Sequence, residues 1–158
     1  MERVEKCYVA IKPGFANYLD VILEIQSRLV NAGLKITKVA FVIYNAKDAA
    51  EHYLNKKDEK YYQELINYMT SDRVCGMIVE GENAIKIVRG LVQRDKDAGL
   101  QEGDIRYDIP KMLNMKHDLT KNVIHASDCP EAAAKEIAIF ENIIKRQKNI
   151  KPDNLIQL

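Results

Sequence analysis

The chain of 158 residues carries 24 Lys and Arg against 23 Asp and Glu, a net charge of +1, and 47% of its residues are hydrophobic. This length and apolar content predict a single domain over residues 1–158 with a sizeable core. The near-neutral charge gives no basis for nucleic acid as the main partner, and the longest apolar runs are too short to span a bilayer.

Short apolar runs and helical stripes alternate along the first part of the chain. The run "CYVAIK" is closed by Pro13-Gly14, which predicts a strand followed by a loop. Apolar residues at helical spacing, followed by Gly33, predict an amphipathic helix, and a later run rich in β-branched and aromatic residues predicts a long strand. In chain order these elements are a strand (7–12), a helix (19–32), a strand (34–45), two helices (47–55 and 60–70), a strand (73–81) and a helix (82–93).

The second part of the chain is less regular. Residues 94–121 show weak periodicity, two glycines, one proline and many charges, so we expect an irregular stretch that is functional or mobile. The run "NVIHAS" at 122–127 predicts a strand, and 129–147 predicts a helix that starts with Pro130. The polar tail, 148–158, is expected to pack on the surface.

This order of elements predicts an α/β (α+β) fold. The β-α-β-β-α-β core with added helices is the ferredoxin-like pattern, an antiparallel sheet with helices on one face. A doubly wound parallel sheet is the alternative, although the chain offers no Gly-rich turn from strand to helix for it.

Cysteine use and the N-terminus predict a cytoplasmic protein. The first residues start charged and soon read as a strand, unlike a signal peptide. The cysteines, Cys7, Cys75 and Cys129, include no Cys-x-x-Cys pair, which predicts free thiols in a reducing compartment. No cluster has the ligand spacing of a zinc site, so no metal ligands are predicted.

His125 ends the last predicted strand, and its pattern fits a packed core imidazole, a metal ligand or a nucleophile. Lys12 ends the first strand, Arg89 lies in a helix, Arg106 lies in the irregular stretch and Asn122 begins the last strand. If these residues converge, three cations that bind phosphate oxygens surround one imidazole. Such an arrangement suits phosphoryl transfer through a phosphohistidine, but spacing alone does not assemble it.

Three tyrosines, Tyr53, Tyr61 and Tyr62, lie around a predicted corner between two helices. An aromatic ring at the rim of a site can stack on a nucleobase, an interaction worth roughly 1–3 kcal/mol that tolerates every base. Ordinary packing of amphipathic side chains is the alternative interpretation.

Five runs carry further information: "YVAIKPG", "EHYLNKKDEKYYQELINYMTS", "VCGMIVEGENAIKIVRGL", "GDIR" and "NVIHASDCPEAAAKEIAIF". Together and in this order they resemble the nucleoside diphosphate kinase family. The resemblance covers nearly all of residues 7–140. It implies the ferredoxin-like fold and a ping-pong transfer of the γ-phosphate from a nucleoside triphosphate such as ATP to a nucleoside diphosphate.

The resemblance also implies roles for catalytic residues. His125 matches the family's phosphorylated histidine, and Glu136 matches the glutamate that orients it by hydrogen bonding. Ser127 matches a serine close to that histidine. Lys12 matches the lysine that contacts phosphate and the ribose 3′-hydroxyl. Mg²⁺ is expected to arrive on the nucleotide's phosphates with few protein ligands, and Asp128 to reach it through water.

The implied nucleotide-binding residues lie in five further segments. Tyr53 matches the tyrosine beside the phosphate pocket, and Tyr61 stands where the family usually has a phenylalanine that stacks on the base. Arg89 and Arg106 match its two phosphate-binding arginines. Asn122 matches the asparagine that bonds the ribose 3′-hydroxyl.

Three departures from the family pattern bear on function. Asp95 stands where the family commonly has a threonine that donates to phosphate, and a carboxylate repels phosphate unless it turns away or pairs with a neighbour such as Arg94. The first loop, "KPGFANYLD", lacks the family's acid and arginine. That loop supports subunit packing, so a homo-oligomer is expected but its hexameric form is in question. A nucleotide-binding regulator or scaffold with weakened catalysis is therefore the alternative function.

The third departure is an insertion between Arg106 and Asn122, roughly residues 108–121. We expect it to extend a surface loop, as a hairpin, a subunit contact or a partial lid. His117 within the insertion is expected to be solvated. His52 is expected to be a helix-packing residue.

Overall fold

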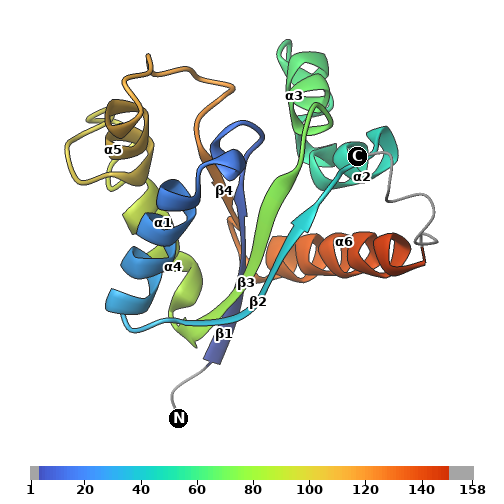
Figure 1. Cartoon of the computed structure of the whole chain (residues 1–158), viewed down its shortest axis with the longest axis horizontal. Coiled ribbons are helices and arrows are strands. Elements are labelled where there is room, and N and C mark those ends of the chain that lie inside the picture. Colours follow the sequence, from blue (N-terminus) through green and yellow to red (C-terminus); the bar gives the residue numbers. More distant parts are fainter. Residues whose placement is uncertain (1–3, 150–158) are drawn as a thin grey trace.

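A four-stranded antiparallel sheet in the order β2-β3-β1-β4 lies at the centre of the computed structural model, which describes residues 4–149 (Figure 1). The strands are β1 (Val4–Ile11), β2 (Lys35–Val42), β3 (Val74–Glu82) and β4 (Ile124–Ala126). The α-helices are α1 (Leu19–Asn31), α2 (Ala46–His52), α3 (Tyr62–Met69), α4 (Ala84–Val92), α5 (Ile105–Met112) and α6 (Pro130–Lys148). Two single 3₁₀ turns, η1 (Phe15–Asn17) and η2 (Leu54–Lys56), complete the described elements.

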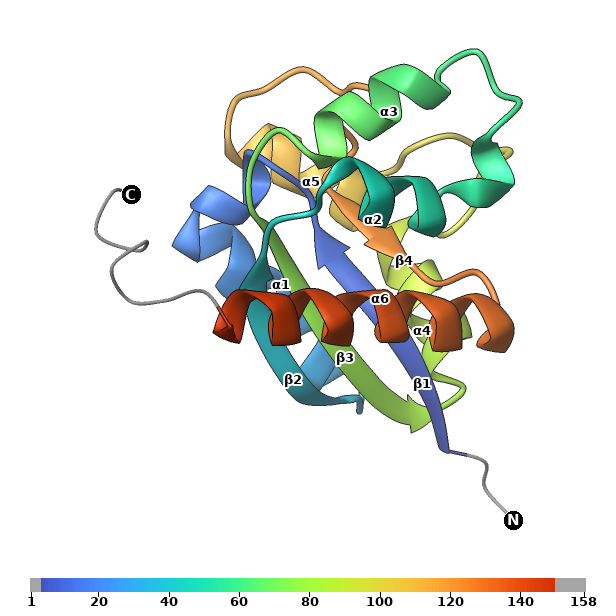
Figure 2. The ribbon, with the colours of Figure 1, turned by 90° about the vertical axis from the view of Figure 1, so that its right-hand side faces the viewer.

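Helices cover both faces of this sheet. Figure 1 shows α1, α4 and α5 on one side and α2, α3 and α6 on the other, and Figure 2 shows α6 crossing the second face. The alternation of β1 explains the two layers, because Cys7, Val9 and Ile11 join one apolar cluster while Tyr8 and Ala10 join the other. The ferredoxin-like α+β prediction is confirmed, but the expectation of helices on one face was wrong. The added helices α2 and α3, together with α6, cover the second face.

The long helix α6 lies close against the sheet. Its buried stripe includes Ala133, Phe140 and Ile143, one helical turn or two apart. A Cβ atom at Gly76 of β3 would lie only 2.4 Å from a ring atom of Phe140. The absence of a side chain at Gly76 therefore lets α6 approach the strands, and this approach sets the position of Glu136 beside β4.

The stretch predicted to be irregular, 94–121, contains the helix α5. Asp104 is fully buried just before α5, where its carboxylate accepts hydrogen bonds from the backbone N–H of Gln101 (2.9 Å) and from Nε of Arg94 (3.0 Å). Ile105 and Ile109 fill the core beneath α5. Pro110 inside the helix and the short apolar stripe hid α5 from pattern reasoning, because burial outweighs local propensity here.

The first loop is tied down within the chain. Nδ2 of Asn17 donates to Asp72 across 2.9 Å, and Nε of Arg73 donates to Oδ1 of Asn17 across 2.9 Å. Gly14 in this loop adopts a φ of 85°, which suits glycine. These bonds stabilise a loop that lacks the family's usual acid and arginine.

Two further findings concern the ends of the chain and membranes. α6 runs to Lys148, and the rest of the tail predicted to pack on the surface lies outside the described residues. None of the helices between residues 4 and 149 combines the length and apolar character that crossing a bilayer requires.

Candidate active site

His125 lies in the middle of β4, opposite Ala10 of β1 in the sheet register. Since Ala10 belongs to the apolar cluster under α2, α3 and α6, the pleat directs the His125 ring to that same face. The ring meets Tyr8 from β1 and Tyr53 after α2, with centroid distances of 6.2 and 6.1 Å. The strand thus delivers the histidine to a partly enclosed position in which only 16% of its side chain is exposed.

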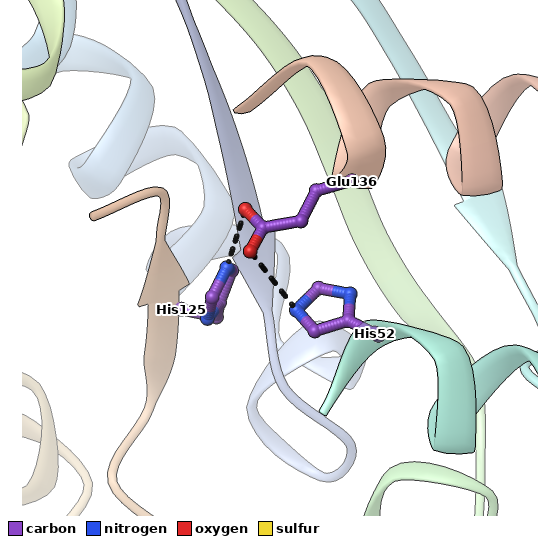
Figure 3. A group of neighbouring side chains, drawn as sticks. All are labelled: His52, His125 and Glu136. Atoms are coloured by element: carbon purple, nitrogen blue, oxygen red, sulfur yellow. Dashed lines mark hydrogen bonds and ion pairs between the residues drawn. The ribbon is translucent and has the colours of Figure 1, made fainter. Parts of the chain in front are cut away.

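Glu136 of α6 meets this histidine directly (Figure 3). Nε2 of His125 lies 2.9 Å from Oε1 of Glu136, a hydrogen bond between strand and helix. Because a carboxylate accepts, Nε2 carries the proton and Nδ1 keeps its lone pair. The bond therefore selects the tautomer in which Nδ1 can act as a nucleophile.

Glu136 is itself held in place by the sheet. Oγ of Ser127 donates to Oε1 of Glu136 across 2.7 Å, and the backbone N–H of Tyr8 donates to Oγ of Ser127 across 2.9 Å. Glu136 sits in the buried stripe of α6, and burial raises the pKa of its carboxyl. A charged residue on the apolar stripe of a helix is the signal by which pattern alone could have selected Glu136.

Charge and burial keep His125 neutral. Burial, with the nearby Lys12 as the next cause, lowers the pKa of His125 to about 3. Burial, followed by repulsion from Arg106, also lowers the pKa of Lys12 to about 7. Near neutral pH the imidazole is thus uncharged and Lys12 is divided between its two forms.

Lys12, Arg106 and Asn122 converge at the start of β4. Nζ of Lys12 donates to Oδ1 of Asn122 across 2.6 Å, and Nε and Nη2 of Arg106 donate to the carbonyls of Asn122 (3.2 Å) and Ile124 (2.9 Å). Between these carbonyls Val123 has a φ of 79°, which is strained for a β-branched residue. Arg106 and the backbone N–H of Lys12, which donates to the Val123 carbonyl across 2.8 Å, hold that conformation.

Arg89 approaches from α4 and pairs with Asp128, the residue that follows Ser127. Both side chains are open to solvent, with 34% and 58% of their surface exposed. Its pairing with Asp128, three residues after His125, brings Arg89 near the histidine, and the charge of Arg89 is a minor cause of the lowered pKa of His125. The structure therefore brings the three predicted cations, Lys12, Arg89 and Arg106, around one imidazole.

Asp95 turns toward its own loop. Its Oδ1 accepts hydrogen bonds from the backbone N–H of Asp97 (2.9 Å) and of Ala98 (3.4 Å). The pairing partner suggested by the sequence, Arg94, contacts Asp104 instead, at 3.0 Å. Asp95 thus replaces the expected phosphate donor with an exposed residue that stabilises a turn.

The two tyrosines predicted to bind nucleotide differ in exposure. Tyr53 is 6% exposed, packs edge-on against His125, and its hydroxyl has no hydrogen-bond partner between residues 4 and 149. Tyr61, just before α3, is 42% exposed. Tyr62 is partly buried against the second apolar cluster, in agreement with ordinary packing.

His52 is a residue whose position the sequence did not reveal. It is buried at the end of α2 and packs against Tyr44 and Tyr53, as expected of a helix-packing residue. Its ring also lies 4.4 Å from that of His125, and its Nε2 lies 3.8 Å from Oε2 of Glu136. That separation is too long for a hydrogen bond, and Nε2 has no partner within the described part of the chain. A buried polar atom without a partner costs about 1–3 kcal/mol.

The insertion, residues 108–121, begins within α5 and continues from the end of that helix to the site, and Figure 1 shows this segment passing over one end of the sheet. The Thr120 carbonyl accepts a long hydrogen bond of 3.5 Å from Nζ of Lys12, and Nζ of Lys121 lies 5.8 Å from the ring centre of Tyr68. His117 is exposed, as predicted, and stacks on Tyr107 at 5.2 Å. The insertion thus ends beside Lys12 and forms no strand hairpin among residues 113–121.

Comparisons with known proteins agree with this fold and site. The family model described as nucleoside diphosphate kinase matches residues 5–143. The nucleoside diphosphate kinase of Archaeoglobus fulgidus is 35% identical over 137 residues, which cover 87% of this chain and 86% of that protein. The enzyme of Methanocaldococcus jannaschii is 36% identical over 136 residues, 86% of this chain and 92% of that protein.

Solved structures lead to the same family. A halophilic nucleoside diphosphate kinase from Halobacterium salinarum in complex with CDP superposes with a TM-score of 0.75 at 33% identity, over 87% of this chain and 88% of that one. Fold and sequence together define a phosphotransferase built on the ferredoxin-like sheet. The chain belongs to the nucleoside diphosphate kinase family. Its activity is transfer of a terminal phosphate between nucleotides.

Proposed function

We propose that this nucleoside diphosphate kinase works through a phosphohistidine on His125. The hydrogen bond of 2.9 Å from Nε2 of His125 to Glu136 carries the proposal, because it leaves the Nδ1 lone pair for attack. Nδ1 forms a bond to the γ-phosphorus while the bond from that phosphorus to the bridging oxygen breaks, and the nucleoside diphosphate leaves. A second diphosphate then attacks the phosphorus with a terminal oxygen, and the phosphorus–nitrogen bond breaks.

The cations around His125 supply binding and charge stabilisation. Lys12, Arg89 and Arg106 present the donors that phosphate oxygens prefer, and their charge offsets the negative charge of the transferring group. Ser127 and Glu136 fix the orientation of the His125 imidazole beside these cations. Positioning and charge, which dominate phosphoryl transfer, thus come from residues just after β1, on and just after β4, and on α4, α5 and α6.

Mg²⁺ enters this scheme as part of the nucleotide substrate. The site groups cations with an exposed carboxylate, Asp128, which suits an ion held mostly by phosphates and water. Asp128 would contact the ion through water. The ion would neutralise charge on the phosphates.

Sugar and phosphate contacts dominate nucleotide recognition in this proposal. Asn122 bonds the ribose 3′-hydroxyl together with Lys12, and the buried Tyr53 packs beside the phosphates. The exposed ring of Tyr61 stacks on the base, so every base is accepted. Both nucleoside diphosphates and triphosphates are therefore substrates.

The alternative, a regulator with weakened catalysis, rested on Asp95 and on the altered first loop, and that loop is held by hydrogen bonds of Asn17 to Asp72 and Arg73. The carboxylate of Asp95 accepts hydrogen bonds from its own turn, so it need not face the phosphates. Active catalysis is accordingly the function that the geometry supports best.

We further propose a homo-oligomer built on the edge of the sheet. Among residues 4–149, β2 pairs only with β3, so its outer edge offers unpaired backbone groups apart from the Phe41 carbonyl, which accepts from Nε2 of Gln147 across 3.1 Å. The strand also exposes Val39 and Phe41. Leu23 and Val30 of α1 add apolar surface beside it, around a groove of about 490 Å³. Such a patch is self-complementary across a two-fold axis, which suits a second copy of the chain.

We place the enzyme in the cytoplasm. Cys7, Cys75 and Cys129 are free thiols, as expected in a reducing compartment.

Labelling tests the catalytic proposal. Incubation with γ-labelled ATP should give an acid-labile, alkali-stable phosphoprotein, and His125→Ala should give none. His117→Ala is the matched control, since it removes an exposed histidine from the insertion and should keep the label. Label retained on His125→Ala would reject His125 as the nucleophile.

A further inference from the structure

His52, His125 and Glu136 form a group of potential metal ligands that the sequence spacing did not reveal. One ligand atom from each of these residues lies within 4.8 Å of the others, and Figure 3 shows the three side chains facing one another from α2, β4 and α6. Two imidazoles and one carboxylate are the ligand set of many zinc sites with an open fourth position. Zinc bonds of about 2.0–2.2 Å require the three atoms to draw together by only a small side-chain movement.

The buried Nε2 of His52 is the second observation that points to a ligand. His52 is 3% exposed, and this atom has no hydrogen-bond partner in the part of the chain that the structure describes. It is directed at the Glu136 carboxylate, 3.8 Å away. Native proteins rarely leave a buried polar atom without a hydrogen-bond partner or ligand. An ion bound between His52 and Glu136 would give Nε2 of His52 that partner.

The residues around the group suit metal ligands as well. The Tyr44 hydroxyl lies 3.4 Å from Nδ1 of His52, where it accepts an N–H once Nε2 is used for a metal. The Tyr44 hydroxyl also lies 2.7 Å from the Tyr8 hydroxyl, which continues the chain of hydrogen bonds. Ser127 donates to Glu136 from the opposite side. Ligating histidines typically have such a partner on their second nitrogen.

We propose that His52, His125 and Glu136 form an inhibitory binding site for Zn²⁺. A metal at Nε2 of His125 displaces the proton that Glu136 holds there, and the neutral ring then carries its proton on Nδ1. A protonated Nδ1 has no lone pair for the γ-phosphorus, so the metal and phosphorylation exclude one another. Mg²⁺, which prefers oxygen ligands, does not compete for this site.

The neighbouring charges determine the fourth ligand. The positive charges of Lys12 and Arg106 repel a zinc ion near His125 and attract an anion bound to that ion. Hydroxide or a phosphate oxygen is therefore the fourth ligand of the zinc.

Zinc binding is measured first without nucleotide, by competition with a chromophoric chelator, and Co²⁺ serves as a probe for tetrahedral absorption bands. His52→Asn should weaken zinc binding by at least about tenfold and abolish those bands. His117→Asn and Cys129→Ser are matched controls that should bind like the wild type. Unchanged zinc affinity in His52→Asn would overturn the proposal.

Inhibition is measured as the ratio of phosphohistidine formation rates with and without buffered free Zn²⁺. The ratio should be low in the wild type and close to one in His52→Asn, and an equal ratio in both would reject inhibition at this site. If His52→Asn does not fold, zinc-soaked crystals of the wild type decide, since the anomalous peak must lie among the three side chains and not at a cysteine. The inhibition by zinc rests on the proposed role of His125 as the phosphorylated residue. The zinc-binding and diffraction results do not rest on that role, so the zinc site and the phosphohistidine can be rejected separately.

Discussion

Nε2 of His125 and Oε1 of Glu136 lie 2.9 Å apart, and this bond joins the last strand to the last helix of the sheet's second face. It determines which nitrogen of the imidazole carries the proton. Glu136→Gln removes the charge that holds this tautomer while keeping the size of the side chain. We expect the rate of phosphohistidine formation to fall by about 10- to 100-fold.

Rapid-quench labelling with γ-labelled ATP measures that rate, and circular dichroism checks the fold. The KM for nucleotide should change little, because Glu136 contacts the histidine and not the phosphates. A variant with the wild-type rate would show that the carboxylate does not set the tautomer.

The pH dependence of kcat/KM near neutral pH should follow the titration of Lys12 and not that of His125. The pKa of Lys12 is lowered to about 7, so its positive charge is present below that pH and is lost above it. We expect kcat/KM for nucleotide to fall as the pH rises through 7. Since the pKa of His125 is lowered to about 3, the imidazole stays neutral and adds no loss between pH 5 and 7.

Lys12→Arg tests this assignment, because an arginine stays charged throughout the range. Its absolute activity will be lower, but its normalised profile should lose the decline above pH 7. A decline that persists unchanged in Lys12→Arg would assign it to another group.

Substitution of Arg106 should lower the stability of the fold more than substitution of Arg89, although both arginines belong to the site. Arg106 donates to two partly buried backbone carbonyls that flank Val123, so Arg106→Gln should lower the free energy of unfolding by about 1–3 kcal/mol. Arg89 forms an exposed pair with Asp128, so Arg89→Gln should change stability by less than about 1 kcal/mol. Urea unfolding measures both.

Nucleotide affinity should fall in both arginine variants, since each loses a cation that we propose binds phosphate. Equal stability of the two variants would contradict the structural role given to Arg106. Wild-type affinity in Arg89→Gln would remove Arg89 from the phosphate site.

The turn around Asp95 should tolerate loss of its charge. Asp95→Asn keeps an acceptor for the backbone N–H of Asp97 and removes the negative charge. Because exposed charges interact by about 0.2–1 kcal/mol, kcat/KM for ATP should rise by less than about fivefold. A hundredfold rise at physiological salt would show that the carboxylate faces the phosphates and would revive the weakened-catalysis alternative.

The edge of β2 should control assembly. Val39 is 48% exposed beside the groove between α1 and β2, and a charge there would be buried between subunits. Val39→Glu should lower the molar mass measured by sedimentation velocity toward that of one chain. Leu119→Glu is the control, because Leu119 is 98% exposed in the insertion and should leave assembly unchanged.

Much of the fold follows from local patterns. Strands 7–12, 34–45 and 73–81 and the helix after Pro130 were predicted within a few residues, because their hydrophobic periods are strong. α5 was missed because Ile105 and Ile109 are buried by tertiary contacts that outweigh Pro110. The placement of helices on both faces also depended on packing, since a sequence period says which side of a helix is buried but not against which face of a sheet.

The site, like the fold, depends partly on local sequence patterns and partly on tertiary contacts. The sequence by itself determined the types of residue at the site, a histidine in the last strand and three cations, and its resemblance named their roles, whereas the structure places that histidine in the middle of β4 and not at its end. Only the tertiary structure decided that Asp95 turns to its own loop and that His52 faces Glu136, 84 residues further along the chain. The reason is physical: hydrogen bonds and ligand contacts depend on distances of about 3 Å between segments far apart in sequence, and no local pattern encodes those distances.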